Sequence, residues 1–128
     1  MGDALLEVEG STIEECFEGS AYAFLGLTYD VEKVKPKIHR TIELEGFDIE
    51  NLLYRWLEKL LILLTAENFA VGKASVKINE LKLKADIWGE LYSRKKHGFK
   101  REVKGITYHL MSVETNSSSC KIRFLADL

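Results

Sequence analysis

The sequence contains little of what small disulfide-bonded or zinc-binding domains require. Its only cysteines are Cys16 and Cys120, which lie far apart in the chain. A disulfide framework needs several cysteines, and a zinc site needs closely spaced pairs of them. We therefore expect both thiols to be reduced and to pack in the core of a cytoplasmic protein.

Long apolar runs are also missing. The run at residues 60–64, LLILL, is far shorter than the roughly 20 residues that cross a bilayer. The first ten residues, MGDALLEVEG, have no basic segment, and their apolar positions alternate with charged ones, which disfavours a signal peptide. The sequence thus predicts a soluble, cytoplasmic protein without membrane contact.

A strong net charge is absent as well. The 18 basic and 20 acidic residues leave a net charge of -2, which argues against a surface built entirely for nucleic acid. The charge is nevertheless uneven. Residues 94–104, RKKHGFKREVK, carry six Lys or Arg and one Glu, so this segment is +5 and the rest of the chain is -7. Such a local excess indicates a polar partner at one place.

Motifs of common enzymes do not occur in the sequence. It has no phosphate-binding loop, no GxSxG, no HExxH and no Cys-x-x-Cys. The three histidines, His39, His97 and His109, are scattered, and a lone histidine on a strand is more often structural than catalytic. A conventional histidine-based enzyme is therefore disfavoured.

The apolar periodicity predicts one α+β domain over residues 1–128. A helix follows the Ser11–Thr12 cap and ends near Gly26, and the strongest helix, residues 48–64, carries a broad stripe of leucines. Trp56 and Trp88 are assigned to packing. Strands are predicted at residues 4–8, 38–44, 69–76, 80–90, 106–115 and 121–127. This order favours a two-layer sandwich, with two helices packed on one face of a mostly antiparallel or mixed sheet.

Carboxylates near the two chain ends offer a candidate metal site. Asp3 lies near the start of the sequence, and Asp127 precedes Leu128, which carries the α-carboxylate. If the first and last strands are neighbours, these groups present hard oxygen ligands suited to Ca²⁺ or Mg²⁺. On the residues alone, solvated chain-end carboxylates are the simpler interpretation.

Five segments, in order, resemble the archease family from end to end. They are MGDALLEVEG, STIEECFEGSAYAFLGL, LLYRWLEKLLILL, GELYSRKKHGFKREVKGITYHL and the final ADL. The most specific is EVKGITYHLMSV, which is similar to the family signature E-V-K-A-x-T-Y-H with Gly105 in place of Ala. The resemblance implies a non-catalytic protein that assists an RNA-splicing ligase of the RtcB type, promoting its guanylylation and multiple turnover.

The resemblance also implies a metal site. In the family's segment D-H-T-A-D-V-G the last Asp is a metal ligand, and Asp3 occupies that place, although Gly2 replaces the Ala. Asp127 and Leu128 match the family's ending, in which the Asp and the terminal carboxylate complete the site. A divalent cation, calcium with magnesium as the alternative, is therefore expected at Asp3, Asp127 and Leu128, with the termini close together.

The family's loop before the E-V-K strand carries polar groups beside the metal. By resemblance the partner-contacting or activating residues here are Glu90, Lys96, His97 and Lys104. A flexible basic arm beside a cation suits contact with a guanylylation site, where phosphates and acidic metal ligands concentrate. The alternative is an ordinary solvated loop.

Three classes of function are open. The preferred one is the cofactor of an RNA ligase. The second is a tRNA-binding module, or a chaperone that modulates a tRNA cytosine methyltransferase; the acidic remainder of the chain predicts that RNA contact is indirect or weak. The third, a small metal-dependent enzyme, is disfavoured because no general base or nucleophile is organised around the carboxylates.

Overall fold

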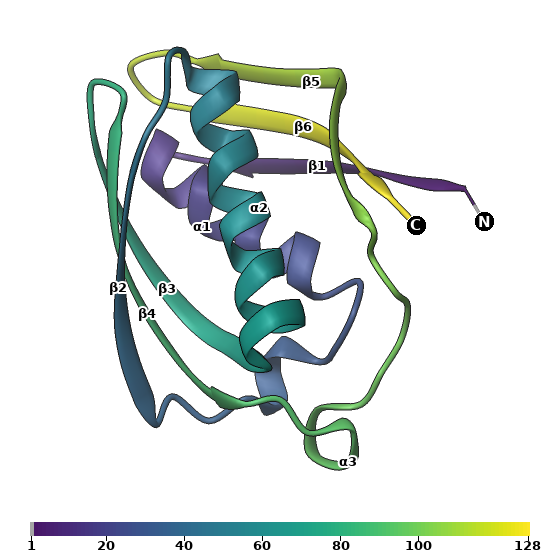
Figure 1. Cartoon of the computed structure of the whole chain (residues 1–128). Coiled ribbons are helices and arrows are strands. Elements are labelled where there is room, and N and C mark those ends of the chain that lie inside the picture. The colour runs from purple at the N-terminus through teal and green to yellow at the C-terminus, as the bar shows by residue number, and fades with distance from the viewer. Residues whose placement is uncertain (1) are drawn as a thin grey trace.

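Two antiparallel sheets make up the strand framework of the protein (Figure 1). The computed structural model describes residues 2–128. The elements are β1 (Asp3–Gly10), α1 (Ile13–Leu25), a 3-10 turn η1 (Val31–Lys33), β2 (Ile38–Glu45), α2 (Ile49–Glu67), β3 (Phe69–Asn79), β4 (Lys82–Leu91), α3 (Arg94–His97), β5 (Gly105–Thr115) and β6 (Cys120–Asp127). One sheet has the order β1-β6-β5 and the other β2-β4-β3.

The α+β class is confirmed, but the layers differ from the expectation of one sheet. The strands divide into two sheets, and each strand pair among the described residues is antiparallel, so the mixed alternative does not occur there. Both long helices touch both sheets: α1 contacts β1, β6 and β3, and α2 contacts β5, β3 and β2. The helices therefore fill the space that the two sheets enclose, instead of covering a single face.

Polar side chains define where the long helices begin and end. The Thr12 hydroxyl accepts a hydrogen bond from the Glu15 amide at 3.1 Å, and the Glu15 carboxylate accepts one from the Ser11 amide at 3.1 Å. This reciprocal pair is a capping box. Asp48 caps α2 by accepting from the Asn51 amide at 2.7 Å. Asn68, in the left-handed conformation with φ 54°, ends α2 beyond the predicted boundary.

The apolar stripe of α2 forms the centre of the core. Trp56 is fully buried, and its indole N–H donates to the Phe17 carbonyl of α1 at 2.9 Å, which joins the two helices. Phe24 of α1 meets Phe124 of β6 edge to face, with ring centroids 6.0 Å apart. The packing predicted for Trp56 is confirmed. Trp88 does not join this core, because it lies on the opposite face of its sheet, away from the helices.

Both cysteines pack in the interior, as predicted. The thiols are free and buried, and the Cys16 Sγ donates to the Cys120 carbonyl at 3.0 Å. Burial raises the pKa of the Cys16 thiol to about 12. Each of these cysteines therefore acts as a small apolar side chain at the contact of α1 with β6.

The first and last strands lie side by side, which brings the two ends of the chain together (Figure 1). Their register runs from Asp3 opposite Asp127 to Gly10 opposite Cys120. The Leu128 amide also donates to the Gly2 carbonyl at 3.1 Å. The predicted closeness of the termini is confirmed. Within residues 2–128, no helix combines the length and apolar character needed to cross a membrane.

The packing of α2 can be tested with one pair of variants. Leu60→Ala should lower the free energy of unfolding by about 2–5 kcal/mol, because the lost side chain is fully buried and its removal leaves a cavity. Ile62 lies on the same helix but is 44% exposed, so Ile62→Ala is the matched control and should cost less. Urea denaturation followed by circular dichroism measures both. Equal losses would contradict this orientation of the helix.

Candidate functional site

The strand pairing places the two predicted metal-binding aspartates next to each other. Asp3 of β1 is directly opposite Asp127 of β6, so their side chains project from the same face of the sheet. On the other side of β6, the Lys104 amide donates to the Asp127 carbonyl at 2.8 Å. Asp3, Asp127 and Lys104 line one open pocket of about 570 Å³. We call it the chain-end pocket.

The chain-end pocket also contains residues of α2 that the sequence did not single out. Tyr54 and Glu58 lie one helical turn apart and face Asp3 and Asp127 across the pocket. Partial burial and then the nearby Glu58 carboxylate raise the pKa of Tyr54. Their spacing on the flank of the predicted helix was the available signal for a role in a site, but the same spacing is typical of an ordinary solvated helix edge.

Two carboxylates of this pocket, Asp3 and Asp127, offer the oxygen donors that a hard cation prefers. No group of three His, Cys, Asp or Glu side chains gathers at metal-binding distance anywhere in residues 2–128. Asp3 and Asp127 are the carboxylate pair that could hold a cation, and Leu128, whose amide donates to the Gly2 carbonyl, follows Asp127 at the same strand ends. Carboxylate oxygens suit Ca²⁺ or Mg²⁺, whereas zinc prefers nitrogen and sulfur ligands.

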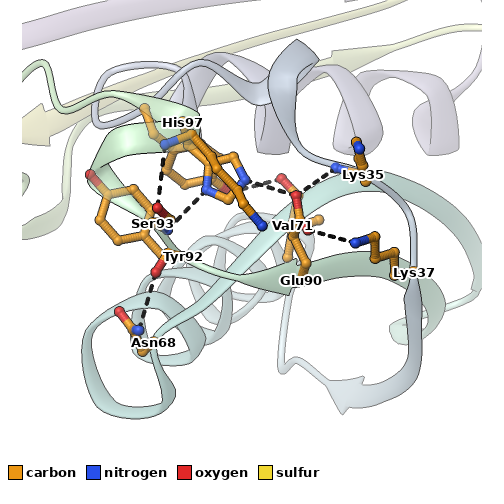
Figure 2. Close-up of polar contacts among 10 residues, drawn as sticks. Lys35, Lys37, Asn68, Val71, Glu90, Tyr92, Ser93 and His97 are labelled. Carbon is orange, nitrogen blue, oxygen red and sulfur yellow. Dashed lines mark hydrogen bonds and ion pairs between the residues drawn. The ribbon is translucent and has the colours of Figure 1, made fainter.

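Glu90 and His97 do not reach this pocket; they pair with each other in the interior (Figure 2). The ring of His97 is fully buried, and its Nε2–H donates to the Glu90 Oε2 at 2.9 Å. The Ser93 amide donates to Nδ1 at 3.0 Å, so that nitrogen acts as an acceptor and the proton sits on Nε2. We call this pair the Glu90–His97 clasp.

The clasp binds a third segment of the chain. The Lys35 amide donates to the Glu90 carboxylate at 3.0 Å, and the Lys37 ammonium lies 3.9 Å from it (Figure 2). The Lys35 hydrogen bond, followed by the one from His97, lowers the pKa of Glu90 from its ordinary value of 4.5 to about 2. The rings of Tyr29 and Tyr92 lie 6.4 and 5.8 Å from that of His97 and enclose it. Glu90 and His97 therefore position the loop, and burial keeps their own atoms from a partner.

The basic segment 94–104, which we call the basic loop, is held against the domain and is not the flexible arm that we expected. The Asp30 amide donates to the His97 carbonyl at 2.9 Å, and the Lys100 amide donates to the Thr28 carbonyl at 2.7 Å. The Lys100 ammonium donates to the Gly26 carbonyl at 3.1 Å. Residues 94–97 form α3, capped by the Ser93 hydroxyl. The basic side chains are nevertheless exposed, Lys96 and Lys104 among them.

The predicted site residues thus fall into two groups. Lys104 joins Asp3 and Asp127 at the chain-end pocket. Glu90 and His97 form the clasp, and Lys96 lies exposed on α3 beside it, where its charge contributes to the lowered pKa of Glu90. The two groups are connected by residues 98–103, in which Val103 is buried.

The signature strand β5 is irregular next to the chain-end pocket. Its register with β6 breaks between Thr107 and Ser112, and Leu110 has a φ of 61°, a conformation that a bulky residue seldom adopts. Tyr108 is 48% exposed and stacks on Tyr54 with ring centroids 4.5 Å apart. Its hydroxyl accepts from the Asn51 side chain at 2.8 Å. The signature therefore forms a bulge with exposed aromatic and apolar side chains.

Fold and site together define a class of small α+β domains whose paired first and last strands set carboxylates and a lysine around one pocket. The chain belongs to the archease family: the family model described as "Archease protein family (MTH1598/TM1083)" matches residues 1–128. The resemblance found in the sequence is thereby confirmed.

Relatives and solved structures agree with this assignment. The "Protein archease" of Pyrobaculum neutrophilum is 36% identical over 98% of this chain and 89% of its own. That of Thermococcus kodakarensis is 45% identical over 82% and 77%. The solution structure of protein 1598 of Methanobacterium thermoautotrophicum has a TM-score of 0.83 at 30% identity, covering 100% and 94% of the two chains. A Thermotoga maritima archease, described as a possible chaperone, shares the fold with a TM-score of 0.70 at 19% identity, covering 98% and 90%.

Acid denaturation tests the clasp. A carboxylate whose pKa is depressed in the folded state stabilises that state above its unfolded pKa, and this stabilisation is lost as the pH falls through the folded pKa. Glu90→Gln should therefore be less stable than wild type at pH 7, and the gap should narrow between about pH 4.5 and pH 2. Urea titrations at several pH values measure it. Glu114→Gln, an exposed change of equal charge on β5, is the control. A gap that stays constant with pH would contradict the ionic role of Glu90.

Proposed function

We propose that this protein is a non-catalytic cofactor of an RNA-splicing ligase of the RtcB type, which promotes guanylylation and multiple turnover of the ligase in the cytoplasm. The observation that carries the proposal is Lys104, a residue of the family signature, beside the paired carboxylates Asp3 and Asp127. An exposed cation next to a metal-binding carboxylate pair suits contact with a partner site rich in phosphate and metal.

The proposal includes a divalent cation, calcium with magnesium as the alternative, held by Asp3, Asp127 and the carboxylate of Leu128. Such an ion would supply positive charge that acidic groups or phosphates of the partner can share. The backbone of Lys104 would lie beside the ion, because its amide donates to the Asp127 carbonyl. In this scheme the protein's residues bind and orient, and the chemistry takes place on the ligase.

The clasp supports the same proposal indirectly. It fixes α3 through buried hydrogen bonds, so Lys96 is presented from a helix with little freedom to move. A lysine on a fixed helix loses less conformational entropy on binding a partner than a lysine on a free loop. Glu90 and His97 therefore act as positioning residues for the exposed loop.

A second candidate function is a chaperone, or a tRNA-binding module, that modulates a tRNA cytosine methyltransferase. The exposed bulge of β5 favours contact with a protein, since Tyr108 and Leu110 are 48% and 45% exposed. Phe47, 75% exposed, precedes α2, where its amide donates to the same Asn51 side chain that bonds Tyr108. Methyltransferase aggregation and activity assays with this protein separate this role from ligase activation.

Calcium binding tests the metal proposal. Asp127→Asn and a variant with residues appended after Leu128 should each bind Ca²⁺ at least about tenfold more weakly in calorimetry, because each removes one anionic ligand. Asp30→Asn, which changes an equal charge at η1, is the control. If wild type and both altered forms bound Ca²⁺ with the same affinity, the ligand set would be wrong.

Ligase assays test the function itself. Lys104→Ala and Lys96→Ala should reduce the stimulation of ligase guanylylation, whereas their stability should change by no more than about 0.5 kcal/mol because both side chains are exposed. Lys121→Ala, at a half-exposed lysine paired with Glu7, is the matched control. Full stimulation by both loop variants in single-turnover assays would rule out this role for the loop.

A further inference from the structure

Among residues 2–128, no helix packs against the outer face of the β2-β4-β3 sheet (Figure 1). Alternate residues of these strands point away from α1 and α2. The register arranges them in four rows across the sheet: His39, Trp88 and Lys73; Thr41, Asp86 and Ser75; Glu43, Lys84 and Lys77; and Glu45, Lys82 and Asn79. We call this surface the open face.

An aromatic ring stands at the centre of the first row. Trp88 is partly exposed on the middle strand, with the His39 ring 5.2 Å from its own and the Lys73 ammonium 5.0 Å from its centroid. Tryptophan usually buries its ring in a core or an interface. Here the Lys73 ammonium lies over the ring and the His39 imidazole lies beside it, so a base that stacks on Trp88 would displace this ammonium from the ring.

Lysines form the positive part of the open face. Lys73, Lys77, Lys82 and Lys84 are exposed on β3 and β4, and none belongs to the ion pairs among the described residues. Lys77 is directly opposite Lys84, and like charges in this position destabilise a sheet. A bound anion would relieve that repulsion.

Two acidic residues of the open face, Glu43 and Glu45, lie on β2, and Asp86 lies among the lysines of β4. Asp86 is engaged by the His39 ring at 2.8 Å, which lowers the pKa of its carboxyl. Glu43 and Glu45 are on β2, opposite Lys84 and Lys82. The β3 and β4 side of the face is therefore positive, although the whole chain carries a net charge of -2.

We propose that the open face binds a short single-stranded segment of RNA, with one base stacked on Trp88 and the phosphates beside Lys73, Lys77 and Lys84. Exposed aromatic rings among basic side chains on a sheet are the usual platform for single strands, because every base presents a flat π-face. An acidic protein segment would use the lysines but would have no need of the ring. A duplex keeps its bases stacked inside and cannot reach Trp88.

This site goes beyond the ligase-cofactor role and uses none of its residues. The chain-end pocket is built by the β1-β6-β5 sheet and α2, whereas the open face belongs to the other sheet. Loss of ligase stimulation and loss of RNA binding are therefore separable results.

Fluorescence anisotropy tests the proposal. The protein is titrated into a labelled oligouridylate of about 12 nucleotides at several salt concentrations, with no change to the chain-end pocket. Trp88→Ala should weaken binding about 5- to 150-fold, the usual loss for one stacked base. Trp88→Phe should retain most of the affinity because a ring remains. Intrinsic fluorescence gives a second readout: Trp56 is fully buried, so quenching by RNA reports Trp88.

The lysines are tested by the salt dependence. Changing Lys73, Lys77 and Lys84 together to Gln should reduce the slope of log affinity against log salt by about two units, since each phosphate contact to a single strand contributes about 0.7. Lys121→Gln, on the other sheet, should leave the slope unchanged. Circular dichroism confirms that each variant is folded.

Several results would overturn the proposal. They are no binding of the oligonucleotide by wild type at low salt, equal affinity of folded Trp88→Ala, or tighter binding of a duplex of the same length. Displacement of the RNA by polyglutamate at equal charge concentration would instead assign the open face to an acidic protein. Each of these results leaves the ligase assays unaffected.

Discussion

The pairing of the first strand with the last is the constraint on which the rest of the molecule depends. It makes β6 the central strand of its sheet, with β1 on one side and β5 on the other. The inner side of β6 buries Ile122, Phe124 and Ala126, and Phe124 meets α1 through Phe24. The core therefore cannot close until segments from the two ends of the sequence have met, a long-range contact of the kind that slows folding.

The same pairing assembles the chain-end pocket. Asp3 and Asp127 meet only because the register places them opposite each other, and Lys104 joins them through its hydrogen bond to Asp127. Two carboxylates side by side repel each other, and a bound cation or a basic partner would offset that repulsion. The clasp differs from this pocket, because the Glu90 carboxylate already accepts hydrogen bonds from Lys35 and His97. The clasp therefore stabilises the fold.

The sequence predicted those features that depend on local patterns. The Asp48 cap and the leucine stripe were enough to place α2, and alternating residues placed most strands. Alternation tells which side of a strand is buried but not which strand is its neighbour, so the division into two sheets was not predictable. Trp88 was misread for a related reason, because a tryptophan on a strand does not reveal which face is covered.

The candidate site shows a similar limit. The prediction that Asp3 and Asp127 lie together was correct, because the family resemblance implied that the two termini are close together. The clasp was not foreseen, because the burial of Glu90 and His97 depends on a backbone amide of Lys35 from a distant segment. A resemblance transfers residue identities, but exposure is a property of the folded packing.

The bulge in β5 decides how a partner can approach this side of the protein. β5 is an edge strand, and a regular edge offers a row of free amide and carbonyl groups to which another chain can add as a further strand. Between Thr107 and Ser112 that row is interrupted, and the positive φ of Leu110 turns the backbone out of line. The Leu110 carbonyl is instead taken by the Arg123 side chain at 3.0 Å. Residues 108–111 are therefore poorly suited to the addition of a further strand, and a partner that contacts this part of β5 would do so through side chains.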